Sequence, residues 1–104
     1  MADSSIDELL ALAKAQFASG LGARVAAIEG PVGRRAWEEA RRAAHKLRGA
    51  AATYGFTALG ASAGEMEELL LEVRDAPGPE LQARIVELVS AVRAEAARVS
   101  AGSS

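Results

Sequence analysis

Cysteine is absent from this chain of 104 residues, so it can form neither disulfides nor thiolate metal sites. Aromatic residues make up only 4% of the sequence, and alanine accounts for much of its hydrophobic half. Small apolar side chains suit closely packed helices better than a sheet, which favours branched and aromatic residues. The length allows one domain at most and is sufficient for a single hydrophobic core.

The sequence also lacks a strong excess of positive or negative residues, and its formal net charge is only −2. This balance gives no support for general binding to nucleic acid. No apolar run approaches the ~20 residues that are needed to span a bilayer. The N-terminal stretch MADSSIDELL lacks the basic and apolar regions of a signal peptide. We therefore expect a cytoplasmic protein with neither nucleic acid nor membrane as a partner.

Apolar residues recur at three- and four-residue spacing along the chain, and no useful length of it alternates with a period of two. The pattern predicts a first helix that starts at a capping box over residues 5–8 and is broken near Gly20 and Gly22. A stop signal for this segment lies at Gly30 and Pro31.

Three further helices are expected, from about residue 33 to 55, from about 57 to 76, and from 79 towards the C-terminal end. Gly55 suits a left-handed C-terminal cap, and Pro79 suits the first turn of a helix. The prediction is an all-α, antiparallel four-helix bundle with a broken or short extra N-terminal helix. We expect one domain over residues 1–104, ordered from about 5 to 100, with Trp37, Leu47, Leu59, Met66, Leu70, Leu88 and Val92 in one core.

The only histidine lies in the stretch EARRAAHKLRGAAATYG, which begins at Glu39. On a helix, His45 lies beside the apolar stripe, so it should be near the surface. Its helical neighbours are Arg41, Arg42, Arg48 and Gly49. A glycine inside a helix costs about 1 kcal/mol relative to alanine, so the glycine needs an explanation.

Two interpretations of this surface remain open from the residues alone. In one, it is a solvated basic face whose histidine has no chemical role. In the other, His45 carries a phosphoryl group, Arg48 pairs with its oxygens, and Gly49 clears space for a bulky partner.

The sequence gives little support for a metal site, a catalytic triad or a nucleotide-binding loop. A lone histidine with scattered carboxylates is weak support for a metal site, and no nucleophile accompanies it for a catalytic triad. A glycine-rich phosphate loop of the GxxxxGK type is absent. The carboxylates over residues 65–68 are expected to form a solvated helix face.

The histidine stretch resembles the histidine-containing phosphotransfer (HPt) domain family. The pattern is histidine, hydrophobic residue, basic residue and glycine, then small residues, a second glycine and a glutamate near the end. It matches His45, Lys46, Leu47, Arg48, Gly49, Ala52, Gly55, Leu59, Ala63, Met66 and Glu67.

The resemblance implies a four-helix bundle that relays phosphoryl groups in a two-component phosphorelay. His45 would be phosphorylated on its outer ring nitrogen, and Arg48 stands where the family more often has lysine. Gly49 would give access to the ring, and the remaining contacts to the phosphoryl group or partner are expected from Arg41, Arg42 and Ala52.

The same resemblance implies the partners, a response-regulator receiver domain and a sensor or hybrid histidine kinase. The chain would be a monomeric phosphoryl carrier that is not itself an enzyme and has no cofactor or metal of its own. The alternative is a non-catalytic docking module, HPt-like in fold, that regulates a kinase or receiver without turnover.

Overall fold

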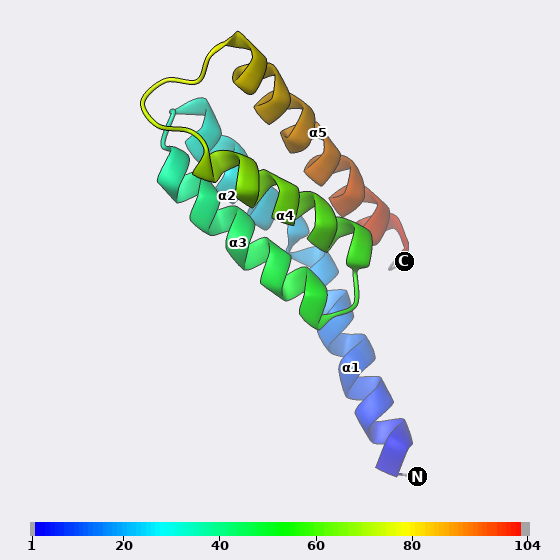
Figure 1. Cartoon of the computed structure of the whole chain (residues 1–104). Helices are drawn as coiled ribbons and strands as arrows, with labels where there is room; N and C mark the ends of the chain where they lie inside the picture. Colours follow the sequence, from blue (N-terminus) through cyan, green and yellow to red (C-terminus); the bar gives the residue numbers. More distant parts are fainter. Residues whose placement is uncertain (1, 103–104) are drawn as a thin grey trace.

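Five helices make up the computed structural model of the chain, which describes residues 2–102 (Figure 1). Helices α2 to α5 form an antiparallel four-helix bundle in which each packs on the next and α5 closes the ring against α2. No strand occurs within the described residues, so the predicted all-α bundle is confirmed. The helices are α1 (Ala2–Ser19), α2 (Leu21–Gly33), α3 (Trp37–Thr53), α4 (Thr57–Leu71) and α5 (Pro79–Gly102).

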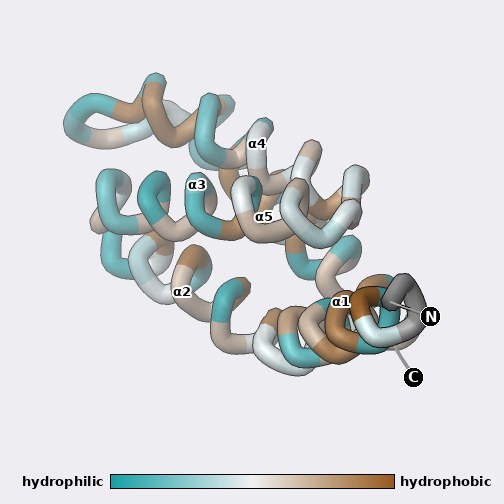
Figure 2. Tube along the Cα trace, turned by 90° about the horizontal axis from the view of Figure 1, so that it is seen from below, coloured by the Kyte–Doolittle hydropathy of each residue, from teal (hydrophilic) through white to brown (hydrophobic). Residues whose placement is uncertain are grey.

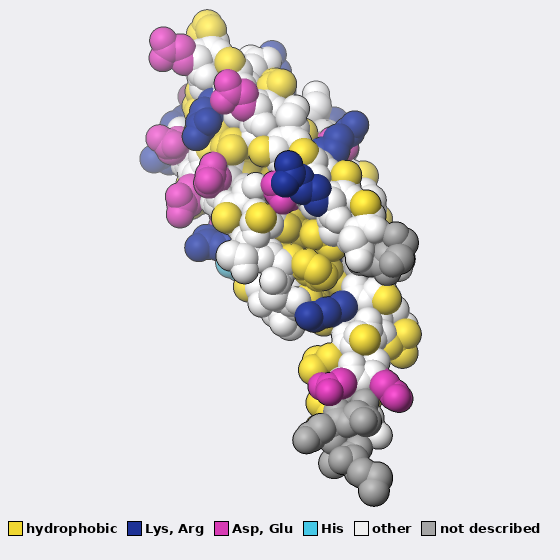
Figure 3. All heavy atoms as spheres, turned by 90° about the vertical axis from the view of Figure 1, so that its right-hand side faces the viewer, with side chains coloured by type: hydrophobic (Ala, Val, Ile, Leu, Met, Phe, Trp, Pro, Cys, Tyr) yellow, Lys and Arg dark blue, Asp and Glu magenta, His cyan; other side chains and the backbone are white. Residues whose placement is uncertain are grey.

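Helix α1 projects beyond the bundle and makes the molecule 56 Å long but only 20 and 19 Å across (Figure 1). It joins the core at Phe17, whose ring packs against those of Tyr54 and Phe56. The projecting turns carry hydrophobic residues on the surface (Figures 2 and 3), and Ile6, Leu9, Leu10 and Leu12 are each more than half exposed. The predicted break near Gly20 is confirmed, whereas the predicted capping box at residues 5–8 is wrong because α1 is already helical from Ala2.

One hydrophobic core runs along the bundle axis and includes side chains from α1 to α5. Of the predicted core residues, only Trp37 is not fully buried; it packs at the edge of the core at the start of α3. The other six are buried as expected: Leu47, Leu59, Met66, Leu70, Leu88 and Val92.

Helix α3 ends in a Schellman turn that sets the direction of α4. Gly55 has φ +79°, and its N–H donates to the carbonyl of Ala52 at 3.2 Å. The N–H of Phe56 donates to the carbonyl of Ala51 at 2.9 Å, which satisfies a second carbonyl of the last turn. The predicted left-handed role of Gly55 is confirmed.

The turn from α2 to α3 has the same hydrogen bonds but no glycine at the left-handed position, where Arg35 has φ 60°. The predicted stop at Pro31 is wrong, because α2 runs through this proline for two more residues. Pro31 lacks an N–H, but its carbonyl still accepts the N–H of Ala36 at 2.8 Å and closes the turn. Helix α3 therefore starts at Trp37, later than predicted.

The left-handed backbone at Arg35 gives a prediction about stability. Arg35→Gly should raise the free energy of unfolding by about 1 kcal/mol, because an L side chain crowds the following carbonyl in this conformation. The side chain of Arg35 forms no hydrogen bond or ion pair with the described residues that the substitution would remove. Gly55→Ala is the matched opposite change and should lower stability by a similar amount in urea unfolding. Equal stabilities of all three proteins would contradict the argument.

Candidate functional site

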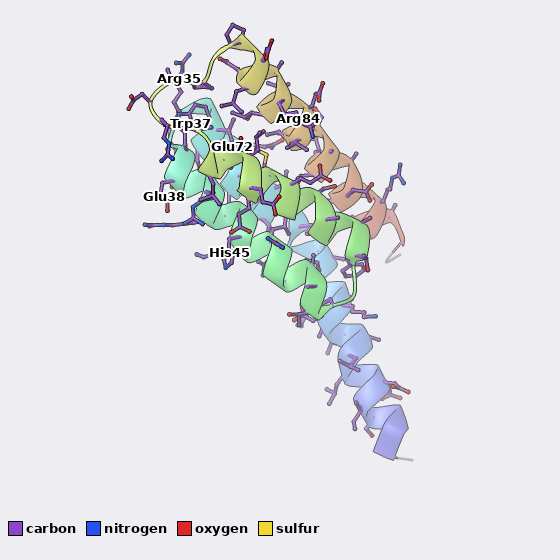
Figure 4. The ribbon with its side chains drawn as sticks, viewed as in Figure 1. Arg35, Trp37, Glu38, His45, Glu72 and Arg84 are labelled. Atoms are coloured by element: carbon purple, nitrogen blue, oxygen red, sulfur yellow. The ribbon has the colours of Figure 1, made fainter. Side chains whose placement is uncertain are left out.

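His45 lies half-way along α3 and points outward from the bundle (Figure 4). Ala44 and Leu47, its neighbours on the helix, are buried, whereas the side chain of His45 is 66% exposed. The sequence-based expectation of a surface histidine beside the apolar stripe is confirmed.

The ring of His45 is anchored by a carboxylate from the adjacent helix. Its Nδ1 lies 2.7 Å from Oε2 of Glu67 on α4. Glu67 is only 8% exposed and is the one charged residue that is buried among those described. The expectation that residues 65–68 form a solvated face is wrong for Glu67, although it holds for Glu65 and Glu68.

Two arginines of α3 complete the environment of the Glu67 carboxylate. Nη1 of Arg48 donates to Oε1 at 3.2 Å, and Nη1 of Arg41 lies 3.6 Å from Oε2. Burial opposes ionisation of this carboxyl, but the hydrogen bonds from Arg48 and His45 outweigh it and hold the pKa of Glu67 below its ordinary value. Glu67 is therefore a carboxylate at neutral pH.

This arrangement selects the tautomer of the histidine. An ionised carboxylate can only accept a hydrogen bond, so a neutral His45 ring places its proton on Nδ1. The lone pair then lies on Nε2, which forms no hydrogen bond with residues 2–102. The outer ring nitrogen is thus a free nucleophile that faces solvent.

Arg48 reaches Glu67 by passing over a glycine on α4. A Cβ placed on Gly64 would lie 3.2 Å from Nε and 3.3 Å from Cδ of Arg48. These separations are tighter than ordinary van der Waals contact, so the absence of a side chain at Gly64 lets the arginine lie flat on α4. The neighbour of Gly64 is thus a side chain of α3 and not its backbone.

The other predicted site residues also lie on α3 and differ in their contacts and exposure. Arg41 also binds Glu38 through a hydrogen bond of 2.9 Å from Nε, and this contact lowers the pKa of Glu38 to about 2. Arg42 is 71% exposed, with Nε 3.4 Å from the same glutamate. A Cβ on Gly49 would meet nothing within 4 Å, so no packing in the described protein requires glycine there. Ala52 is exposed on α3.

Glu67 is the contact of His45 that the periodicity of the sequence did not predict. It follows the buried Met66 by one residue and precedes the buried Leu70 by three, so it lies at the edge of the apolar stripe of α4. That position faces the neighbouring helix. The HPt pattern includes this glutamate, so the resemblance contained a signal whose chemical meaning needed the packing of α3 against α4.

No helix within residues 2–102 is both long and apolar enough to cross a membrane. Among the described side chains, those of residues 5–102, no three or more of His, Cys, Asp and Glu lie together in a way that could hold a metal ion.

The chain matches the model of the family described as Hpt domain over residues 5–101. This match covers nearly the whole chain. No curated protein and no solved structure matches the chain.

The environment of Glu67 predicts a pH-dependent effect on stability. Because its folded pKa lies below the ordinary value of 4.5, the ionised side chain stabilises the fold above that pH and loses this effect as the pH falls. Glu67→Gln should therefore lower the free energy of unfolding by about 1 kcal/mol at pH 7, since hydrogen bonds to a charged group are the stronger ones. The difference from the unsubstituted protein should shrink below pH 4.5, as urea unfolding at several pH values would show.

Glu65→Gln is a matched control on the exposed face of the same helix. It should leave stability within about 0.5 kcal/mol at every pH. A Glu67→Gln effect that is constant from pH 7 to pH 3 would exclude an ionised, paired Glu67.

The contact between Gly64 and Arg48 predicts an energetic coupling between them. In an Arg48→Ala background, Gly64→Ala should stabilise α4 by about 1 kcal/mol, because alanine is the better helix former. With Arg48 present the gain should be smaller by at least about 0.5 kcal/mol, because the guanidinium must move off the helix. Urea unfolding of the four proteins measures this difference.

Gly60→Ala is the control for this cycle. A Cβ on Gly60 would meet its neighbours at 3.7 Å or more, in ordinary contact, and none of these neighbours belongs to the Arg48 side chain. Its effect should be the same with and without Arg48. Equal effects of Gly64→Ala in both backgrounds would show that the arginine does not need the glycine.

Proposed function

Because the chain belongs to the Hpt domain family, whose members are phosphocarrier modules of two-component signalling, we propose that it relays a phosphoryl group between His45 and receiver-domain aspartates. The single observation that supports this role most directly is the hydrogen bond of 2.7 Å from Nδ1 to Glu67, which leaves Nε2 unbound on the surface. A histidine in a merely solvated basic face has no need of a buried carboxylate.

The proposed step is a direct transfer. The lone pair of Nε2 attacks the phosphorus of the aspartyl phosphate, the N–P bond forms, and the bond from phosphorus to the aspartate oxygen breaks to release a carboxylate. The proton on Nδ1 stays in place, so the phosphorylated ring carries a positive charge. Glu67 lies 2.7 Å from that proton and stabilises the charge, and the reverse step restores the neutral ring.

Arg48 contributes electrostatically in this proposal. Its Nη1 donates to Glu67, but a guanidinium has five N–H donors and the Arg48 side chain is 51% exposed. The remaining donors are available to phosphoryl oxygens at the neighbouring ring. Gly49 leaves open space around His45 that a receiver domain would occupy during transfer.

In this role the protein accepts and donates phosphoryl groups but does not make them, so it is a carrier and not a kinase. Receiver domains and sensor or hybrid histidine kinases are the proposed partners. The cytoplasmic location expected from the sequence stays a prediction.

The test is labelling by purified receiver domains charged with acetyl phosphate. The unsubstituted protein should take up the phosphoryl group as an acid-labile, alkali-stable phosphoramidate, and His45→Gln should take up none. His45→Gln should remain folded, because changes at exposed positions usually alter stability by less than about 0.5 kcal/mol. Equal labelling of His45→Gln would overturn the proposal.

In the same assay Gly49→Gln should slow the transfer while α3 becomes more stable, because a Cβ at this position meets nothing within 4 Å and the longer side chain would obstruct the partner. If receivers bind the protein tightly but none labels it, the docking module without turnover is the correct function.

A further inference from the structure

A basic groove lies between α2 and α3, next to His45. Lys46 follows the histidine directly, and Arg42 lies one turn before Lys46 on the same side of α3. Arg24 enters from α2. We call this surface the α2–α3 groove; it is lined by Arg24, Ala27, Glu39, Arg42, Ala43 and Lys46.

Among the described residues, one of the three cations of the α2–α3 groove has an acidic partner: Nε of Arg42 lies 3.4 Å from Glu38. Lys46 forms no ion pair with the described residues, and the guanidinium of Arg24 lies over the ring of Phe17, 5.3 Å from its centroid. The acid in the groove, Glu39, is held by Arg34 at 2.8 Å. The groove therefore presents a positive surface to solvent.

The α4 side of the site is acidic. Helix α3 carries four lysines or arginines and two glutamates, whereas α4 carries three glutamates and neither lysine nor arginine. Glu65, Glu68 and Glu72 line a second groove between α4 and α5, whose one cation, Arg84, binds Glu87 at 3.3 Å. An acidic partner is thus attracted to the α2 side of His45 and repelled from the α4 side.

Gly49 connects the histidine to the α2–α3 groove. It lies four residues after His45 and three after Lys46, so on the helix surface it adjoins both. A Cβ there would meet nothing within 4 Å, so the surface at Gly49 is open beside both residues. A partner that covers Gly49 can contact His45 and Lys46 together.

We propose that the α2–α3 groove is the docking surface for the acidic face of a receiver domain, which approaches His45 from the α2 side. This inference rests on the proposed phosphotransfer function and names the direction of approach and two residues, Arg24 and Lys46, that the function alone does not assign. Carboxylates that surround the receiver's phosphorylated aspartate are the complementary chemistry. Opposite charges on the two surfaces would speed encounter and select the correct orientation.

The experiment reverses charge in the groove and measures transfer from receiver domains charged with acetyl phosphate. Arg24→Glu combined with Lys46→Glu should lower kcat/KM for transfer by about tenfold or more at low ionic strength, with the difference shrinking at high salt. Arg84→Glu combined with Arg98→Glu changes the net charge equally on α5 and should have little effect. All variants should react equally with phosphoramidate, a small phosphoryl donor that needs no docking surface.

The possible failures are distinguishable. If phosphoramidate labels His45 but no receiver labels even the unsubstituted protein, the proposed phosphorelay function fails, and this inference with it. If receivers label the unsubstituted and groove variants at the same rate, or if the α5 variant loses as much, the docking surface is wrong while the function stands. If the groove variants instead lose binding to a fluorescent DNA duplex and keep their transfer rate, the groove serves a nucleic acid and the proposal is overturned.

Discussion

The hydrogen bond between His45 and Glu67 is the interaction on which the site depends. It joins residues 22 positions apart in the sequence and requires α3 and α4 to pack at one register. That register follows from the left-handed turn at Gly55, which reverses the chain directly after α3. The turn and the helix packing together bring a buried carboxylate under an exposed imidazole. Because the hydrogen bond to Glu67 keeps the proton of a neutral ring on Nδ1, the lone pair lies on Nε2.

Burial of Glu67 is possible because its charge is matched from the adjacent helix. A carboxylate removed from water without partners is expected to become protonated, and a protonated Glu67 would no longer select one histidine tautomer. Arg48 and His45 prevent this by forming hydrogen bonds with its two oxygens. The basic stretch of α3 thus has two roles. One side of it keeps Glu67 ionised, and the other side, with Arg42 and Lys46, faces the open groove.

Three glycines near the site are present for three different reasons. Gly55 has a positive φ, which an L side chain adopts only with strain. Gly64 leaves room for the flat side chain of Arg48. Gly49 has an ordinary helical backbone and open surroundings, so no contact within the described protein accounts for it. In the proposed function, the open space at Gly49 is where a partner would approach His45.

The sequence by itself determined the helical class, the broken N-terminal helix, the core stripe and the exposure of His45, because all of these follow from local periodicity and turn chemistry. The predictions of a helix end at Pro31 and of a helix start at the N-terminal capping box were wrong, because helical structure continues through both positions. Only the tertiary structure decided the role of Glu67. A glutamate at the edge of an apolar stripe is solvated or buried according to what the next helix places opposite it, and no local pattern contains that information.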